Sequence, residues 1–210
     1  MTVTNGYTDV VEIREHYADS NNVLTAGIIE RAIESASRWI DRHCGRSFYL
    51  ETATSVGVYR PDDPYVAWVD DIATTTGLVV KTDPTGDYTW SQTWTIDVDF
   101  HLEPRNASRV GTGTTVQPYA YWRIVAVGSK RFPVHQYRDT LQVTAKFGWS
   151  SVPDEVQQAC VLRTASLIDR KNSPNGIAGF GEYGSVRISR QDPDVLTLLH
   201  PYVRMNIGAV

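Results

Sequence analysis

The hydrophobic residues of this chain change their spacing twice, and this change limits the folds that the chain can adopt. Apolar residues recur about every four positions from Leu24 to Ile40, which places them on one face of a long helix. Between about 51 and 150 apolar residues instead alternate with polar ones, as in strands that have one buried and one wet face. A helical pattern returns at about 153–171. The sequence therefore predicts an α+β fold.

Two helices are expected before the alternating region. A short one covers 8–17, with Thr8 as its N-cap. The long one ends at Gly45, which stands where a left-handed helix terminator is expected. Its apolar stripe consists of Leu24, Ile28, Ala32, Ala36 and Ile40, with Trp39 and His43 beside it.

Two strands are clear in the alternating region, at 94–102 and 141–149, and weaker signals lie at 54–59, 77–82 and 119–127. Turn residues separate them. We expect a compact antiparallel β module of about five to seven strands.

The helix after this module begins with Ser151 as a cap and Asp154 completing a capping box. The residues expected to face a core are Val156, Ala159, Cys160, Leu167 and Ile168. Val161, Leu162 and Ala165 are expected outside that stripe. A helix that is apolar over so wide an arc must be covered on more than one side, either by its own domain or by another copy.

The last part of the chain carries a glycine-spaced loop at 176–184 and a short helix opened by Asp192 and Pro193 and ended by Pro201. The predicted organisation is a helical bundle from the N- and C-terminal segments, 1–50 and 151–210, with an inserted antiparallel β domain at 51–150.

Charge is mild overall, at −4, so whole-chain attraction to nucleic acid or to an anionic membrane is not expected. Residues 51–110 hold ten acids and four bases, whereas the residues from 111 onward hold eleven bases and seven acids. This split either gives complementary surfaces between copies or is chance unevenness of a solvated surface.

The two cysteines do not make a disulfide framework, and no signal peptide or apolar run of about 20 residues is present. We therefore expect synthesis in the cytosol and no membrane partner. The five histidines lie in separate elements without metal-ligand spacing, and no nucleophile motif or phosphate-binding glycine pattern occurs. The sequence predicts no enzyme activity, no metal and no cofactor.

Three weaker signals have a plainer interpretation. Asp83 and Asp87 flank a turn as in a calcium loop, but the other oxygen donors are missing. Asp97 and Asp99 have the residue type of an acid–base pair, but alternation places them on a wet strand face. The β module is rich in aromatics, which favours an aromatic core, with a glycan- or receptor-binding face as the alternative. Those aromatics are Trp68, Trp90, Trp94, Trp122, Trp149, Tyr119, Tyr121 and Tyr137.

Several strings, taken in order, resemble the head-to-tail adaptor (connector) proteins of tailed bacteriophages, and most of all those of siphophages that infect actinobacteria. The first is the helix exit at 36–48, and the second is Phe147-Gly148-Trp149 followed by Val152-Pro153. The remaining ones lie at 173–176, 184–190 and 192–202. The resemblance covers both ends of the chain and somewhat under half of it.

This resemblance implies a ring, usually of twelve subunits, docked beneath the portal protein at the capsid vertex. Such a ring extends the DNA channel, lets double-stranded DNA pass without specific binding, and offers a platform to the head-completion (stopper) protein or the tail. It implies a location in the virion at the head–tail interface after assembly in the host cytoplasm, and no cofactor.

A ring subunit needs two complementary flanks, and the wide apolar arc of the second long helix is one candidate. The glycine loop and the C-terminal arm are candidates for ordering on the portal. The candidate portal and ring interface is Val161, Leu162, Ala165, Gly176, Gly179, Phe180, Gly181, Tyr183, Gly184, Arg187, Arg190, Tyr202 and Arg204. The alternative function is a tail or baseplate β module that binds a glycan or a host surface.

Overall fold

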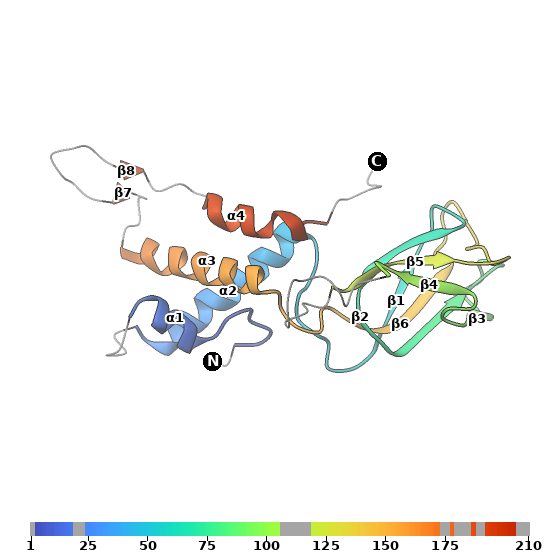
Figure 1. Cartoon of the computed structure of the whole chain (residues 1–210), viewed down its shortest axis with the longest axis horizontal. Helices are drawn as coiled ribbons and strands as arrows, with labels where there is room; N and C mark the ends of the chain where they lie inside the picture. Colours follow the sequence, from blue (N-terminus) through green and yellow to red (C-terminus); the bar gives the residue numbers. More distant parts are fainter. Residues whose placement is uncertain are drawn as a thin grey trace. The chain divides into compact units, whose positions relative to one another are not determined.

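The computed structural model describes residues 3–18, 24–105, 119–172, 177–178, 186–187 and 192–204. It divides into two compact units (Figure 1). The helical unit joins Met1–Arg46 to Val152–Val210, and the β unit is Ser47–Ser151. The α+β class is confirmed, since the first unit is built on helices and the second on one antiparallel sheet. The predicted division into a helical domain at 1–50 and 151–210 and a β domain at 51–150 stays a prediction.

The first two helices of the helical unit follow from their caps. Helix α1 (Val10–His16) begins after Asp9, whose carboxylate accepts a 2.9 Å hydrogen bond from the backbone N–H of Glu12. The predicted N-cap Thr8 is wrong, because its hydroxyl donates to the Glu12 side chain instead. Helix α2 (Ala26–Cys44) ends at Gly45 with φ of 65°, so the predicted left-handed terminator is confirmed.

Two further helices lie in the C-terminal part of the unit. Helix α3 (Asp154–Asn172) occupies the predicted span. Helix α4 (Pro193–Leu199) begins as predicted, because the Asp192 side chain accepts from the N–H of Asp194 and Pro193 stands at the first helical position. A 3₁₀ turn, η2 (His200–Tyr202), follows it.

The core of the helical unit corrects one expectation about α3. Val161 and Ala165, expected outside the core-facing stripe, are buried at 3% and 7% exposure. The reason is that α1 packs on that side, where the hydroxyl of Tyr17 donates a 2.9 Å hydrogen bond to the carbonyl oxygen of Ala165. Leu167, expected in the core, is only partly buried. Helix α3 therefore has α1, α2 and α4 of its own unit around it, and the shared core is Ile13, Ile29, Ile33, Val161 and Ile168.

The β unit is a six-stranded sheet with strand order β1-β6-β2-β5-β4 and β3 paired to β2. The strands are β1 (Ser55–Tyr59), β2 (Val66–Thr82), β3 (Gln92–Trp94), β4 (Phe100–Glu103), β5 (Tyr121–Ala126) and β6 (Leu141–Phe147). All pairs are antiparallel, as predicted. The 17-residue β2 is longer than the predicted 77–82, because register shifts at its middle let one strand pair first with β5 and then with β6.

The strand predicted at 94–102 is wrong as a single element. A turn divides it into β3 and β4, with Asp97 at a φ of 60° and the Asp99 carboxylate accepting from the N–H of Thr95 at 2.9 Å. Val98, expected on the buried face, is 67% exposed. The short acidic side chains stabilise the turn against continued pleating.

A two-stranded pairing lies in the region predicted as a glycine-spaced loop. Strand β7 (Ile177–Ala178) pairs antiparallel with β8 (Val186–Arg187). The residues between these two strands lie outside the described part of the chain.

Candidate functional site

In the turn that resembles a calcium loop, the Asp83 carboxylate accepts hydrogen bonds from the backbone of the chain itself. Asp83 is fully buried, and its Oδ1 accepts hydrogen bonds from the backbone N–H groups of Thr85 at 3.2 Å and Gly86 at 3.0 Å. Its Oδ2 accepts from the N–H of Tyr88. The buried carboxylate is therefore committed to shaping the turn.

The acidic pair of the β3–β4 turn also has structural partners. Asp97 forms an ion pair with Arg105 at 3.4 Å, and Asp99 forms one with Lys130 at 3.6 Å. Within the described ranges, no group of three or more His, Cys, Asp and Glu side chains is placed to hold a metal ion. No helix in that part of the chain is both long and apolar enough to span a membrane.

The tryptophans of the β unit divide between its core and its surface. Trp94 stacks on Phe132 with ring centroids 4.8 Å apart, and Trp149 packs on Phe48 at 5.3 Å, so the predicted aromatic core is confirmed for these two. Trp68 is 42% exposed, and the guanidinium of Arg123 lies 5.2 Å from its ring centroid.

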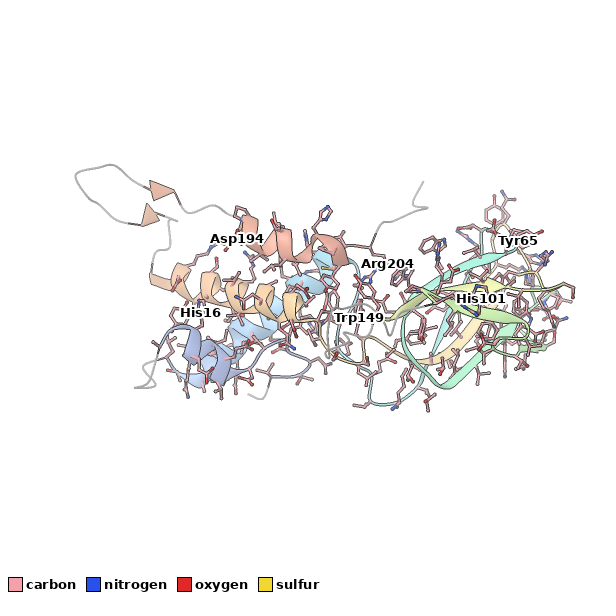
Figure 2. All side chains as sticks on the ribbon, in the orientation of Figure 1. His16, Tyr65, His101, Trp149, Asp194 and Arg204 are labelled. Carbon is pink, nitrogen blue, oxygen red and sulfur yellow. The ribbon has the colours of Figure 1, made fainter. Side chains whose placement is uncertain are left out.

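The segments that enter and leave the β unit are held side by side. The N–H of Glu51 donates to the carbonyl oxygen of Phe147 at 3.0 Å. The N–H of Gly148 donates to the carbonyl oxygen of Asp71 at 2.7 Å, and the indole N–H of Trp149 donates to the Asp71 carboxylate. Figure 2 labels Trp149. The β unit thus begins and ends at one place, which suits an insertion between two halves of another unit.

Gly148, in the second string of the phage-adaptor resemblance, has a physical role here. Its φ is 102°, and a Cβ at this position would lie 1.8 Å from the carbonyl oxygen of Tyr49. Only glycine fits this close backbone approach. The turn before Trp149 therefore requires glycine at position 148.

The candidate interface residues are not all on the surface. Val161 and Ala165 are buried, Leu162 is partly exposed, and Tyr202 is buried with its hydroxyl donating to Glu155 at 2.8 Å. The N–H of Arg204, labelled in Figure 2, donates to the carbonyl oxygen of Cys44 at 2.8 Å. Tyr202 and Arg204 thus hold the C-terminal segment on its own unit.

The other candidates of that interface belong to the glycine-rich segment. The backbone of Arg187 lies in β8, and its side chain is not among those described. The following lie outside the described residues: Gly176, Gly179, Phe180, Gly181, Tyr183, Gly184 and Arg190.

A cationic aromatic stack on the helical unit was not found from the sequence. Trp39 and His43 of α2 stack with centroids 5.0 Å apart and planes 6° apart. The guanidinium of Arg163 in α3 lies 4.6 Å from the Trp39 ring centroid. Burial lowers the pKa of Arg163, and the like charge of Arg170 lowers it further. The spacing of Trp39 and His43 was visible as one helical turn, but Arg163 is distant in sequence and only the packing of α2 on α3 brings it there.

The uneven distribution of charge along the sequence does not give the two units different net charges. The helical unit carries 13 acids and 11 bases, and the β unit carries 11 acids and 9 bases. Each unit therefore has the same surplus of two acids. Any charge complementarity between copies has to come from local patches of each unit.

Three solved structures with a similar fold come from one kind of particle. A chain of the "Neck of empty GTA particle computed with C6 symmetry" superposes with a TM-score of 0.54 at 17% identity. A chain of the "Neck of native GTA particle computed with C12 symmetry" gives 0.54 at 15%. One of the "Virion of native gene transfer agent (GTA) particle" gives 0.50 at 18%.

All three comparisons cover 100% of this chain and 96% of the other. At this level of identity, the likeness establishes a shared fold. No family model matches the sequence. No curated protein matches it. The chain is thus similar in fold, over its whole length, to chains from the neck of gene transfer agent particles.

Proposed function

We propose that this chain is a structural subunit of the neck of a phage-like particle, where it acts as a head-to-tail adaptor. The observation that carries the proposal is the extent of the fold likeness. It covers all of this chain and 96% of a chain from each neck structure, so it includes both the helices and the β insertion. A chance likeness between small helical bundles would not extend through a six-stranded insert.

The proposed assembly is a ring of twelve copies beneath the portal protein. One of the similar neck structures was computed with C12 symmetry and another with C6, which supports a cyclic arrangement. Heterologous contacts that close on themselves give such rings. In this position the ring extends the DNA channel and offers the next surface to the stopper or tail protein. A chain with net charge −4 suits a channel that double-stranded DNA passes without specific binding.

Within this proposal the two units have different tasks. The predicted adaptor domain at 1–50 and 151–210, which contains the helical unit, contacts the portal and the neighbouring copies. The predicted insert at 51–150, which lies within the β unit, is joined through neighbouring segments, as the 3.0 Å hydrogen bond between Glu51 and Phe147 supports. We place the portal contact on Leu162, the glycine-rich segment at 176–184, Arg187 and Arg190. The protein works by binding and sealing at the head–tail interface of a virion that is assembled in the host cytoplasm.

Mixing the chain with its cognate portal protein and imaging the product by electron microscopy tests the docking step. We expect a second ring of density stacked on each portal ring. Bare portal rings at saturating concentration of the chain would count against the adaptor role.

Deleting the gene tests the role in the particle. We expect filled or empty heads that lack tails and lack a layer of neck density below the portal, and restoration of both by the wild-type gene. Particles with a complete neck in the deletion strain would refute the proposal.

A further inference from the structure

In the cationic aromatic stack of Trp39, His43 and Arg163, the guanidinium lacks an acidic partner within the described part of the chain. Arg163 is partly buried on the face of Trp39, and its Nε is buried without a hydrogen-bond partner. In the described part of the chain, no carboxylate forms an ion pair with Arg163. A partly desolvated guanidinium is stabilised further by a carboxylate that pairs with it, so an acidic group from another copy would complete the stack.

The stack lies on the opposite side of α3 from α1. Residues two positions apart on a helix point about 200° apart, so Arg163 and Ala165 face nearly opposite directions. Ala165 is the residue whose carbonyl oxygen accepts from Tyr17, at the end of α1. Figure 1 shows α1 and α4 on opposite sides of α3. The helical unit therefore has two flanks on opposite sides of α3. We call the side that carries α1 the α1 flank, and the side that carries Trp39, His43 and Arg163 the Arg163 flank.

The outward face of α1 has the chemistry that the stack lacks. Ile13 is the buried residue of α1, and Val11 and Glu15 lie two positions before and after it, on the face away from the core. Val11 is 63% exposed, and Glu15 is exposed. An exposed aliphatic side chain beside an exposed carboxylate complements an aromatic ring beside a guanidinium.

The other charged groups of the α1 flank are mostly acidic. Asp9 caps the helix, Glu12 accepts from Thr8, and Asp169 of α3 accepts a 2.9 Å hydrogen bond from the Tyr17 hydroxyl. Arg14 is turned to the carbonyl oxygen of Leu24. On the opposite flank, the exposed Arg42 lies three positions after Trp39 on α2, and the like charge of Arg170 acts on Arg163. The two flanks are therefore opposite in charge as well as in position.

We propose that the Arg163 flank of one copy binds the α1 flank of the next copy, with the Glu15 carboxylate paired to Arg163 and the Val11 side chain packed beside the stack of Trp39 and His43. Since the two flanks are different surfaces on opposite sides of one unit, the contact is heterologous and propagates from copy to copy. This contact gives the subunit interface of the ring under the proposed function. Opposite charges at a desolvated contact also fix the direction in which copies join.

Charge reversal in the full-length chain tests the contact. In sedimentation velocity at low ionic strength, we expect wild-type self-association that rises with concentration and weakens with salt. Arg163→Glu and Glu15→Arg should each weaken association by about tenfold or more, and the double variant should recover most of the loss. Arg131→Glu, a reversal of an exposed arginine in the β unit, serves as the matched control and should leave association unchanged.

The helical content of each variant, measured by circular dichroism, establishes that it is folded. A wild-type chain that stays monomeric at every concentration would overturn the proposal. A double variant that is folded but does not recover association would overturn it as well.

Particles separate this inference from the function on which it rests. If the deletion strain lacks neck density and the Arg163→Glu allele also lacks it, both stand. If the deletion removes the neck but the Arg163→Glu allele builds complete rings, the adaptor role stands and this contact is wrong. If the deletion strain builds a normal neck, the proposed function fails, and the sedimentation result alone decides whether the contact exists.

Discussion

The indole Nε1 of Trp149 donates a 2.8 Å hydrogen bond to the carboxylate of Asp71, which is only 4% exposed. Asp71 lies in the middle of β2, and Trp149 lies where the chain leaves the β unit. The bond therefore fixes the exit of the insert to the central strand of its sheet. Phe48 and Tyr119 pack on the same indole, with ring centroids 5.3 and 4.8 Å away.

Replacing Trp149 with Phe should destabilise the protein by about 1.5–3 kcal/mol, because a buried carboxylate loses a hydrogen-bond donor while most of the ring packing stays. Urea unfolding followed by circular dichroism measures the change. Trp68→Phe is the matched control, since Trp68 is 42% exposed and its loss should cost much less. Equal destabilisation by the two changes would contradict the role given to the Asp71 bond.

Gly148→Ala should destabilise by at least about 3 kcal/mol, because it adds a steric clash with the Tyr49 carbonyl oxygen to an unfavourable positive φ. Gly128→Ala isolates the second effect. Gly128 has a φ of +62°, but a Cβ there would meet nothing within 4 Å, so we expect a cost of about 1 kcal/mol. Thermal or urea unfolding of the two variants checks the difference, and similar midpoints would show that the Tyr49 contact relaxes easily.

The isolated segment Ser47–Ser151 should fold alone. It contains its own sheet, its own core and both partners of each hydrogen bond that ties its ends together. We expect a circular dichroism spectrum typical of strands and a cooperative unfolding transition. The fluorescence of the buried Trp94 and Trp149 should become accessible to a quencher over the same transition. A molten spectrum, without a cooperative transition, would show that the helical unit is needed to complete the fold.

The long periodic elements were predictable from the sequence, and the reason is physical. Helices α2 and α3 run for 19 residues each, so the helical period repeats over several turns and identifies each helix even where the burial of single positions, such as Leu167, is misjudged. The β3–β4 region failed because a regular alternation from Trp94 to Leu102 continues through a turn. Alternation records which residues are apolar, but it does not record that Asp97 adopts a positive φ and Asp99 binds the N–H of Thr95.

The candidate interface shows a second limit. The pattern of α3 correctly indicated that the helix is covered on more than one side, but a single helix does not state which neighbour covers which side. Helix α1 covers Val161 and Ala165 within the unit. The stack of Trp39 and Arg163 was missed because its members lie in helices that are far apart in the chain.

The pH dependence of the free energy of unfolding should reveal the raised pKa values of the two buried thiols, Cys44 and Cys160. Burial raises the pKa of Cys44 to about 12, and burial also raises the pKa of Cys160. A thiol whose pKa is higher in the folded state stabilises that state below the unfolded pKa of about 9, and this contribution is lost as pH rises toward the folded value. The free energy of unfolding of the wild type should therefore fall between about pH 9 and 12.

Cys44→Ala should lower the free energy of unfolding at neutral pH and also flatten its fall above pH 9, because the variant has one thiol fewer to ionise on unfolding. Urea unfolding at pH 7, 9 and 10 measures both effects. Ile40→Val, a core truncation in the same helix without a titrating group, should lower stability equally at each pH. If the two variants lost stability with the same slope, the fall at alkaline pH would belong to other groups, and the Cys44 thiol would titrate much as it does in the unfolded chain.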